Sequence, residues 1–212
     1  MAVPMFDLYV ITDRGLSRGR SDAEIARLAY EGGADVVQLR MKDAPGGIML
    51  EQAKAIKELA DEHAKLFIVN DRVDIAVLSD ADGVHLGQDD IPVAEARELI
   101  GDDKLIGMSV KTLEEALDAV EQGADYLGVG TVFPTRTKHD AGYATGLDAL
   151  FEIREALDIP IVAIGGINLG NIRDVIAAGA DSVAVVSAVV AQDDVAKAAH
   201  DLRDAVLKAK HR

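Results

Sequence analysis

Short runs of aliphatic and β-branched residues alternate along this chain with longer segments in which apolar residues recur every three or four positions. The first pattern is typical of buried β-strands and the second of amphipathic helices. The segment 113–120 illustrates the helical spacing, because its apolar residues would all lie on one face. The order strand, helix, strand continues through nearly the whole chain.

Turns of Gly-Ala-Asp type connect several predicted helices to the strand that follows. They occur at 33–35, 123–125 and 179–181, with a looser version at 80–83. Glycine directly after a helix is the residue expected at a C-cap. The predicted strands are Leu8–Thr12, Val36–Arg40, Leu66–Asn70, Gly83–Leu86, Leu105–Ser109, Tyr126–Val129, Ile161–Ile164 and Ser182–Val186. The predicted helices are Ser21–Glu31, Ile48–His63, Arg72–Leu78, Val93–Ile100, Thr112–Gln122, Leu147–Leu157, Asn171–Ala178 and Val195–Lys208.

Eight strands that alternate with eight helices imply an α/β fold with a parallel sheet. Units of roughly 25 residues are the size of one strand and helix, and eight of them close most naturally into a (β/α)₈ TIM barrel. A doubly wound open sheet is the alternative, but eight strands would make it unusually wide. No linker or low-complexity stretch interrupts the pattern, so we expect a single catalytic domain over residues 1–212.

Composition narrows the class of protein. The chain has 22 Lys+Arg against 37 Asp+Glu and a net charge of −15, so we expect no nucleic-acid or anionic-membrane partner. It has no cysteine, which excludes disulfides and thiolate chemistry. The start of the sequence lacks the features of a signal peptide, and no apolar run reaches membrane-spanning length. These features predict a cytoplasmic protein with small-molecule partners, and a homo-oligomer is compatible with the sequence.

The end of the second predicted strand carries the most informative polar cluster. Gln38, Arg40 and Lys42 share one face because side chains alternate along a strand, while Leu39 and Met41 share the other face. An amide, a guanidinium and an ammonium that point the same way suit a multiply charged anion. Barrel enzymes place their active sites at these strand ends.

Other strand ends are polar too. Asn70 and Asp71 follow the third strand, and Asp90 follows the fourth. Asp71 and Asp90 are candidates for Mg²⁺ ligands, because Mg²⁺ is often held by one or two carboxylates and substrate phosphates. Each aspartate could instead cap a helix. His85 lies within the fourth strand and is interpreted as a packed residue rather than a base.

Two later segments predict further anion contacts. Barrels frequently bind phosphate after the seventh and eighth strands, where Gly165-Gly166 and Ser187 lie. The segment 135–138 contributes two hydroxyls and two cations after the sixth strand. Two anion sites indicate a reaction between two substrates, one with a diphosphate and one with a phosphate. Glycines near 45–47 and 140–142 could let the loops at these positions close over the bound substrates.

Six linked motifs make the sequence similar to thiamine phosphate synthases over nearly its whole length. They are Leu8-Tyr9-Val10-Ile11-Thr12-Asp13-Arg14, Gln38-Leu39-Arg40-Met41-Lys42, Asn70-Asp71-Arg72, residues 81–90, residues 132–138 and Ala163-Ile164-Gly165-Gly166-Ile167. The resemblance implies transfer of a pyrimidine from its diphosphate to a thiazole phosphate with Mg²⁺ as cofactor. It implies that Arg40, Lys42, Ser109 and Lys138 are catalytic; that Gln38, Leu39, Arg40, Met41, Lys42, Asn70, Ser109 and Lys138 bind the pyrimidine diphosphate; that Thr135, Arg136, Thr137, Gly166, Val186 and Ser187 bind the thiazole phosphate; and that Asp71 and Asp90 bind the metal.

Three alternatives remain open at this point. A related tautomerase binds thiazole phosphate and only isomerises it, but it need not keep the metal and diphosphate residues. A Schiff-base aldolase could use Lys138 as its nucleophile. A non-catalytic binding barrel would not need polar residues at five or more strand ends.

Overall fold

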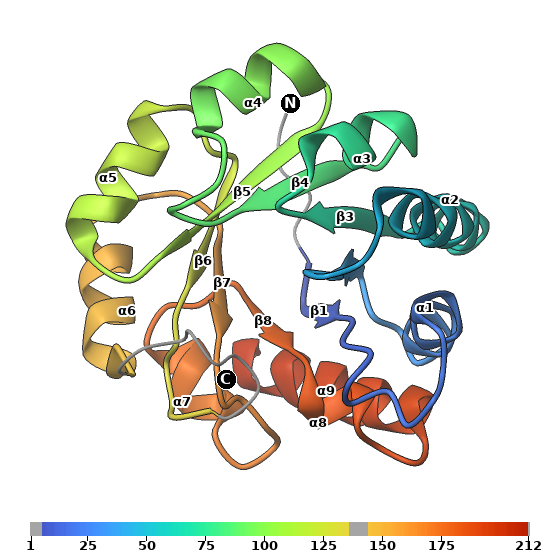
Figure 1. Cartoon of the computed structure of the whole chain (residues 1–212). Helices are drawn as coiled ribbons and strands as arrows, with labels where there is room; N and C mark the ends of the chain where they lie inside the picture. The colour runs from blue at the N-terminus through green and yellow to red at the C-terminus, as the bar shows by residue number, and fades with distance from the viewer. Residues whose placement is uncertain (1–5, 136–143, 212) are drawn as a thin grey trace.

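The computed structural model describes residues 6–135 and 144–211. Its strands form one closed, fully parallel barrel in which each strand pairs with the next and β8 pairs with β1 (Figure 1). The barrel prediction is therefore confirmed, and the open-sheet alternative is wrong. The strands are β1 (Leu8–Ile11), β2 (Val36–Leu39), β3 (Leu66–Asn70), β4 (Gly83–Leu86), β5 (Leu105–Val110), β6 (Tyr126–Val129), β7 (Ile161–Ile164) and β8 (Ser182–Val185).

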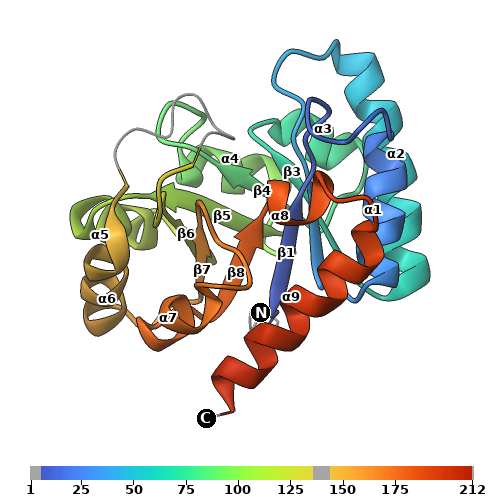
Figure 2. The ribbon, with the colours of Figure 1, turned by 90° about the horizontal axis from the view of Figure 1, so that it is seen from below.

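Helices surround the strands, and the long α9 lies beside α1 and β1 (Figure 2). Several predicted element ends differ from the structure by one or two residues. Two differences are larger: Gly46 and Gly47 belong to the first turn of α2 rather than to a loop, and a short helix, α8, follows β8. The helices are α1 (Asp22–Glu31), α2 (Gly46–His63), α3 (Val73–Leu78), α4 (Val93–Ile100), α5 (Leu113–Glu121), α6 (Gly146–Ala156), α7 (Ile172–Ala177), α8 (Ser187–Val190) and α9 (Val195–Lys210). Among the described residues, no helix combines the length and apolar character that crossing a bilayer requires.

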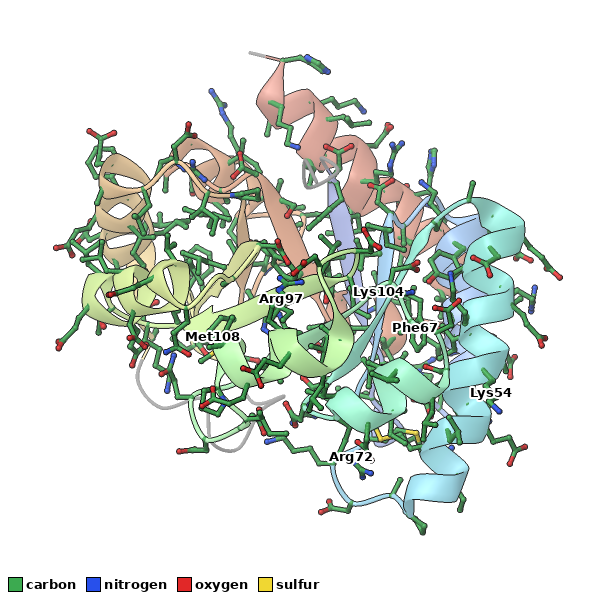
Figure 3. All side chains as sticks on the ribbon, turned by 90° about the horizontal axis from the view of Figure 1, so that it is seen from above. Lys54, Phe67, Arg72, Arg97, Lys104 and Met108 are labelled. Atoms are coloured by element: carbon green, nitrogen blue, oxygen red, sulfur yellow. The ribbon has the colours of Figure 1, made fainter. Side chains whose placement is uncertain are left out.

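Two hydrophobic layers follow from the alternation along each strand. One cluster fills the inside of the barrel, and the larger one lies between the strands and the helices. Val36 belongs to the inner cluster and Leu39 to the outer one, as the alternation in β2 predicts. Phe67, labelled in Figure 3, also belongs to the outer layer. The inner cluster contains Phe6, Tyr9, Ile11, Val36, Ile68, Tyr126, Val162 and Ala184.

Aspartates just before β2, β4, β6 and β8 fasten each of these strands to the one before it. Asp125, for example, accepts a hydrogen bond from the backbone N–H of Ile106 at 2.7 Å and from Arg97 at 2.6 Å. Arg97 is labelled in Figure 3. The Gly-Ala-Asp turns thus do more than end helices, because each aspartate satisfies a backbone donor at the amino-terminal end of the barrel. The equivalent carboxylates are those of Asp35, Asp82 and Asp181.

Among the described residues, five helices end with the same hydrogen-bond pattern. A left-handed residue follows the helix, and the backbone N–H of the next residue donates to the carbonyl five positions earlier. Glycine takes the left-handed position after α1, α5 and α7, at Gly33, Gly123 and Gly179. Ala64 takes it after α2 and Asp80 after α3, with positive φ angles of 51° and 53°. The looser sequence at 80–83 therefore adopts the same turn as the glycine versions.

Candidate active site

A cavity of about 970 Å³ opens at the carboxyl ends of the strands. All eight strands contribute to its lining, which identifies it as the mouth of the barrel. A volume of this size can hold two small substrates together. Each strand contributes at least one residue to the lining. In order from β1 to β8, these include Tyr9, Gln38, Asn70, His85, Ser109, Tyr126, Ile164 and Ala184.

The polar face of β2 and the residues after it line one wall. Gln38, Arg40 and Lys42 all border the cavity. The Arg40 guanidinium lies 3.7 Å from the Asp13 carboxylate, and the Arg40 backbone N–H donates to the Thr12 hydroxyl at 3.2 Å. These contacts with residues just after β1 hold Arg40 at the border of the cavity, where it can meet an anion.

Leu39 and Met41 do not line this cavity. Both are buried in the outer layer, between the strands and the helices. The predicted contacts of these two residues with a pyrimidine diphosphate would therefore involve backbone atoms, because their side chains face away from the barrel mouth.

Asp71 and Asp90 face each other at the ends of β3 and β4. Asp71 has a left-handed backbone with φ of 62°, and its N–H donates to the His85 carbonyl at 2.9 Å. Burial raises the pKa of Asp71 to about 6, together with repulsion from the Asp90 carboxylate and a hydrogen bond that protonated Asp71 donates to Asp90, although Lys42 and Arg40 oppose that rise. A bound divalent cation would relieve the repulsion between the two carboxylates.

Neither aspartate caps a helix, contrary to the alternative interpretation. The N-cap of α3 is Arg72 and that of α4 is Pro92, and neither position has a side-chain cap. Asp90 instead accepts a hydrogen bond from the Gly87 N–H at 2.7 Å, which holds the turn after β4. Among the described residues there is no group of three or more metal-ligating side chains, so Mg²⁺ would take its other ligands from water and substrate.

The opposite wall is built from the ends of β7 and β8. Gly165, Gly166, Val186 and Ser187 border the cavity there, and Thr135 reaches it from the end of the described segment after β6. Gly165 and Gly166 both have positive φ angles, and a Cβ on Gly166 would lie 2.8 Å from the Phe133 Cβ. Glycine is therefore required for the backbone to pass this close.

Two asparagines fix the peptide after Gly166. The side-chain amides of Asn168 and Asn171 donate to the Gly166 carbonyl at 3.1 and 3.0 Å. Because the C=O and N–H of a trans peptide point in opposite directions, the Ile167 N–H faces away from these asparagines. In the described part of the chain no acceptor is found for that N–H. It is a donor available to an anion at this wall.

Three predicted site residues, Arg136, Thr137 and Lys138, lie outside the described residues. Sequence reasoning missed Tyr9 and Tyr126, which form the floor of the cavity. Alternation along the strands could have identified them. Tyr9 lies two residues before Ile11 in β1, so both side chains face the barrel interior, as that of Tyr126 does in β6.

Comparisons with known proteins agree with this geometry. Residues 8–189 match the family model described as thiamine monophosphate synthase. The thiamine-phosphate synthase of Methanoculleus marisnigri is 53% identical over 205 residues, covering 97% of both chains, and that of Chloroflexus aurantiacus is 58% identical over 92% of this chain and 90% of its own. The solved thiamine phosphate pyrophosphorylase of Pyrococcus furiosus superposes with a TM-score of 0.88 at 47% identity over 97% of both chains. The chain described here belongs to the thiamine monophosphate synthase family.

Proposed function

We propose that this chain is a thiamine-phosphate synthase, a transferase. It joins 4-amino-2-methyl-5-(diphosphooxymethyl)pyrimidine to 4-methyl-5-(2-phosphooxyethyl)thiazole, and the products are thiamine phosphate and diphosphate. The observation that carries the proposal is one cavity with two walls of different chemistry. A cationic wall with paired carboxylates comes from β2 to β5, and a wall of backbone donors and hydroxyls comes from β7 and β8.

The cationic wall is assigned to the pyrimidine diphosphate. Arg40 and Lys42 would neutralise the diphosphate oxygens, and Asn70 and Ser109 would donate hydrogen bonds to the same substrate. Lys138 is proposed as a further cation on this group. Gln38 lies deeper and is almost completely buried, so it would contact the pyrimidine end rather than the charged end.

Asp71 and Asp90 are proposed to hold Mg²⁺. Two facing carboxylates, one with a raised pKa, form a site whose charge a divalent cation would balance. When bound, the ion would supply positive charge to the diphosphate oxygens. Arg40 and Lys42 would add positive charge at the same place. Both lie close enough to Asp71 to act on its pKa, which they lower.

The second wall is assigned to the thiazole phosphate. Ser187, at the start of α8, and the backbone near Gly166 and Val186 offer donors that suit a phosphate. Thr135, Arg136 and Thr137 are proposed to complete this site. The thiazole nitrogen would then face the carbon from which diphosphate departs.

The proposed reaction is dissociative. The bond between the pyrimidine methylene carbon and the diphosphate oxygen breaks first, and the electron pair leaves with the diphosphate. The thiazole nitrogen then attacks the pyrimidine cation. Charge stabilisation by Arg40, Lys42 and Lys138 and positioning of the two substrates would supply the catalysis, so no protein nucleophile is needed.

Two other functions are less well supported. A tautomerase would have no use for the carboxylate pair and the cationic wall of the cavity. A Schiff-base aldolase would depend on Lys138, and borohydride trapping of a substrate on that residue would support it.

The decisive experiment incubates the purified chain with both substrates and Mg²⁺ and measures thiamine phosphate and diphosphate. We expect diphosphate release only when both substrates are present and its loss in excess chelator, with recovery when Mg²⁺ is restored. Equal turnover with chelator would contradict the metal assignment. Absence of thiamine phosphate under all conditions would contradict the function itself.

A further inference from the structure

A chain of hydrogen bonds crosses the interior of the barrel beneath the cavity. The Gln38 amide nitrogen donates to the Tyr9 hydroxyl at 2.8 Å, and the Tyr9 and Tyr126 hydroxyls are 3.1 Å apart. The Tyr126 hydroxyl lies 3.1 Å from His85 Nδ1, and His85 Nε2 lies 2.9 Å from the Ser109 hydroxyl. This series of hydrogen bonds thus connects Gln38 on β2 with Ser109 on β5, two residues assigned to the same substrate.

The packing leaves these rings little freedom. A Cβ on Gly107 would lie 2.1 Å from the Tyr126 ring and 2.5 Å from His85 Nδ1. A Cβ on Gly128 would lie 2.8 Å from the His85 ring. Glycines on β5 and β6 therefore make room for His85 and Tyr126, and Phe6 packs edge-on against both tyrosines from below.

The chemistry of the donor groups fixes the direction of each hydrogen bond in this series. An amide nitrogen can only donate, so the Tyr9 oxygen accepts from Gln38. The buried Tyr9 proton then needs an acceptor, and within the described residues the Tyr126 oxygen is the one in reach. Burial raises the pKa of both phenols well above the usual range, so both keep their protons.

The same assignment of donors and acceptors extends to His85 and to Ser109 at the cavity. The Tyr126 hydroxyl donates its hydrogen bond to His85 Nδ1 and keeps its proton. Nδ1 is therefore an acceptor, and the neutral ring carries its proton on Nε2. That proton points to the Ser109 oxygen. The Ser109 hydroxyl, which borders the cavity, then has its own proton to offer to a ligand.

We propose that Tyr9, Tyr126 and His85 form a directional relay that presents the Ser109 hydroxyl as a hydrogen-bond donor to an anionic ligand. The three are positioning residues, since they act on the ligand through Ser109. The identity of the ligand rests on the proposed function, whereas the direction of the relay does not. Without the relay, Ser109 could equally turn a lone pair toward the anion and repel it.

The first test is nitrogen-15 NMR of the histidine rings in the ligand-free chain, with the His85 resonances assigned from a His85→Asn variant. We expect the neutral Nε2–H tautomer for His85. In Tyr126→Phe and Tyr9→Phe the relay is interrupted, and we expect a mixture of tautomers. Tyr30→Phe is the matched control, because its buried hydroxyl donates to the Leu66 carbonyl outside the relay. An Nδ1–H tautomer in the unmodified chain would overturn the proposal.

The second test measures binding of inorganic diphosphate with Mg²⁺ by calorimetry. We expect Tyr126→Phe to weaken binding about fivefold, the size of one neutral hydrogen bond, and Tyr30→Phe to leave it unchanged. In a Ser109→Ala background the Tyr126→Phe change should have no further effect. Additive losses would overturn the relay. If the unmodified protein does not bind diphosphate, that result counts against the proposed function, while the NMR measurement still decides the relay.

Discussion

At the scale of single residues, Asp71 combines a left-handed backbone with a carboxylate that faces another carboxylate in the cavity. Its left-handed backbone is held by the His85 carbonyl, and its carboxylate is placed against that of Asp90. Non-glycine residues rarely adopt this conformation, and where they do so near a site the strain is often linked to function. The placement fits a metal ligand better than a helix cap.

Asp71→Asn tests that role. Asparagine tolerates the left-handed backbone, so we expect the free energy of unfolding to change little. Because the substitution removes one charge from the proposed Mg²⁺ site, turnover should fall by at least about 100-fold. Steady-state kinetics and a denaturant titration measure the two effects. Asp74→Asn, an exposed change in the next helix, is the control; a folded Asp71→Asn variant with full activity would contradict the assignment.

At the scale of elements, helix ends decide how each helix connects to the next strand. The same left-handed turn ends five helices, yet only three of these turns have glycine at the left-handed position. Ala64 adopts it at a cost, because its Cβ crowds the following carbonyl oxygen. The element therefore forms despite an unfavourable residue, through the packing of α2 on its neighbours.

Ala64→Gly should stabilise the protein. Relief of the left-handed strain outweighs the extra entropy of the unfolded chain, and we expect a gain of about 0.5–1 kcal/mol. The opposite change, Gly123→Ala, places a Cβ at the same position of the turn after α5 and should destabilise by a similar amount. Chemical denaturation of both variants measures the difference. Loss of stability in Ala64→Gly would show that the alanine side chain contributes more than its backbone costs.

At the scale of the whole molecule, Asp35 connects the first strand, β1, to the last helix, α9. It accepts hydrogen bonds from the backbone of Asp7 and Leu8, and it pairs with Lys65 and with Arg203 of α9. Burial alone would raise the pKa of Asp35, but the hydrogen bonds from Lys65 and the backbone outweigh burial and lower the pKa. The charged form is therefore the one that stabilises the closed barrel.

A lowered pKa in the folded state gives a specific dependence on pH. The stabilisation is complete above the ordinary aspartate pKa of about 4 and is lost as the pH falls through the lower folded value. We expect Asp35→Asn to cost about 1–3 kcal/mol at pH 7 and the difference from the parent to shrink below about pH 4. Urea titrations across pH test this, with Asp118→Asn on the exposed face of α5 as control. A difference independent of pH would contradict it.

Local pattern predicted much of this protein correctly. All eight strands begin at the predicted residue, since a buried run is visible within four or five positions. The facing of Gln38 and Arg40 was also predictable, because alternation along one strand is a local property. The short helix α8 was missed because four residues contain too little periodicity to be recognised. The pattern predicts a loop at Gly46 and Gly47 because glycine is a poor helix former, yet the helix begins there directly after Pro45.

The sequence by itself therefore determined the order of the strands, the barrel class and the polar residues at the strand ends. The tertiary structure decided which of those residues meet. Tyr9 and Tyr126 are separated by 117 positions and touch only when the barrel closes. The pairing of Asp71 with Asp90 and the contacts of Asp35 with β1 and α9 likewise depend on which elements become neighbours when the barrel closes. The physical reason is that periodicity acts over a few residues, whereas hydrogen bonds and charges act through space.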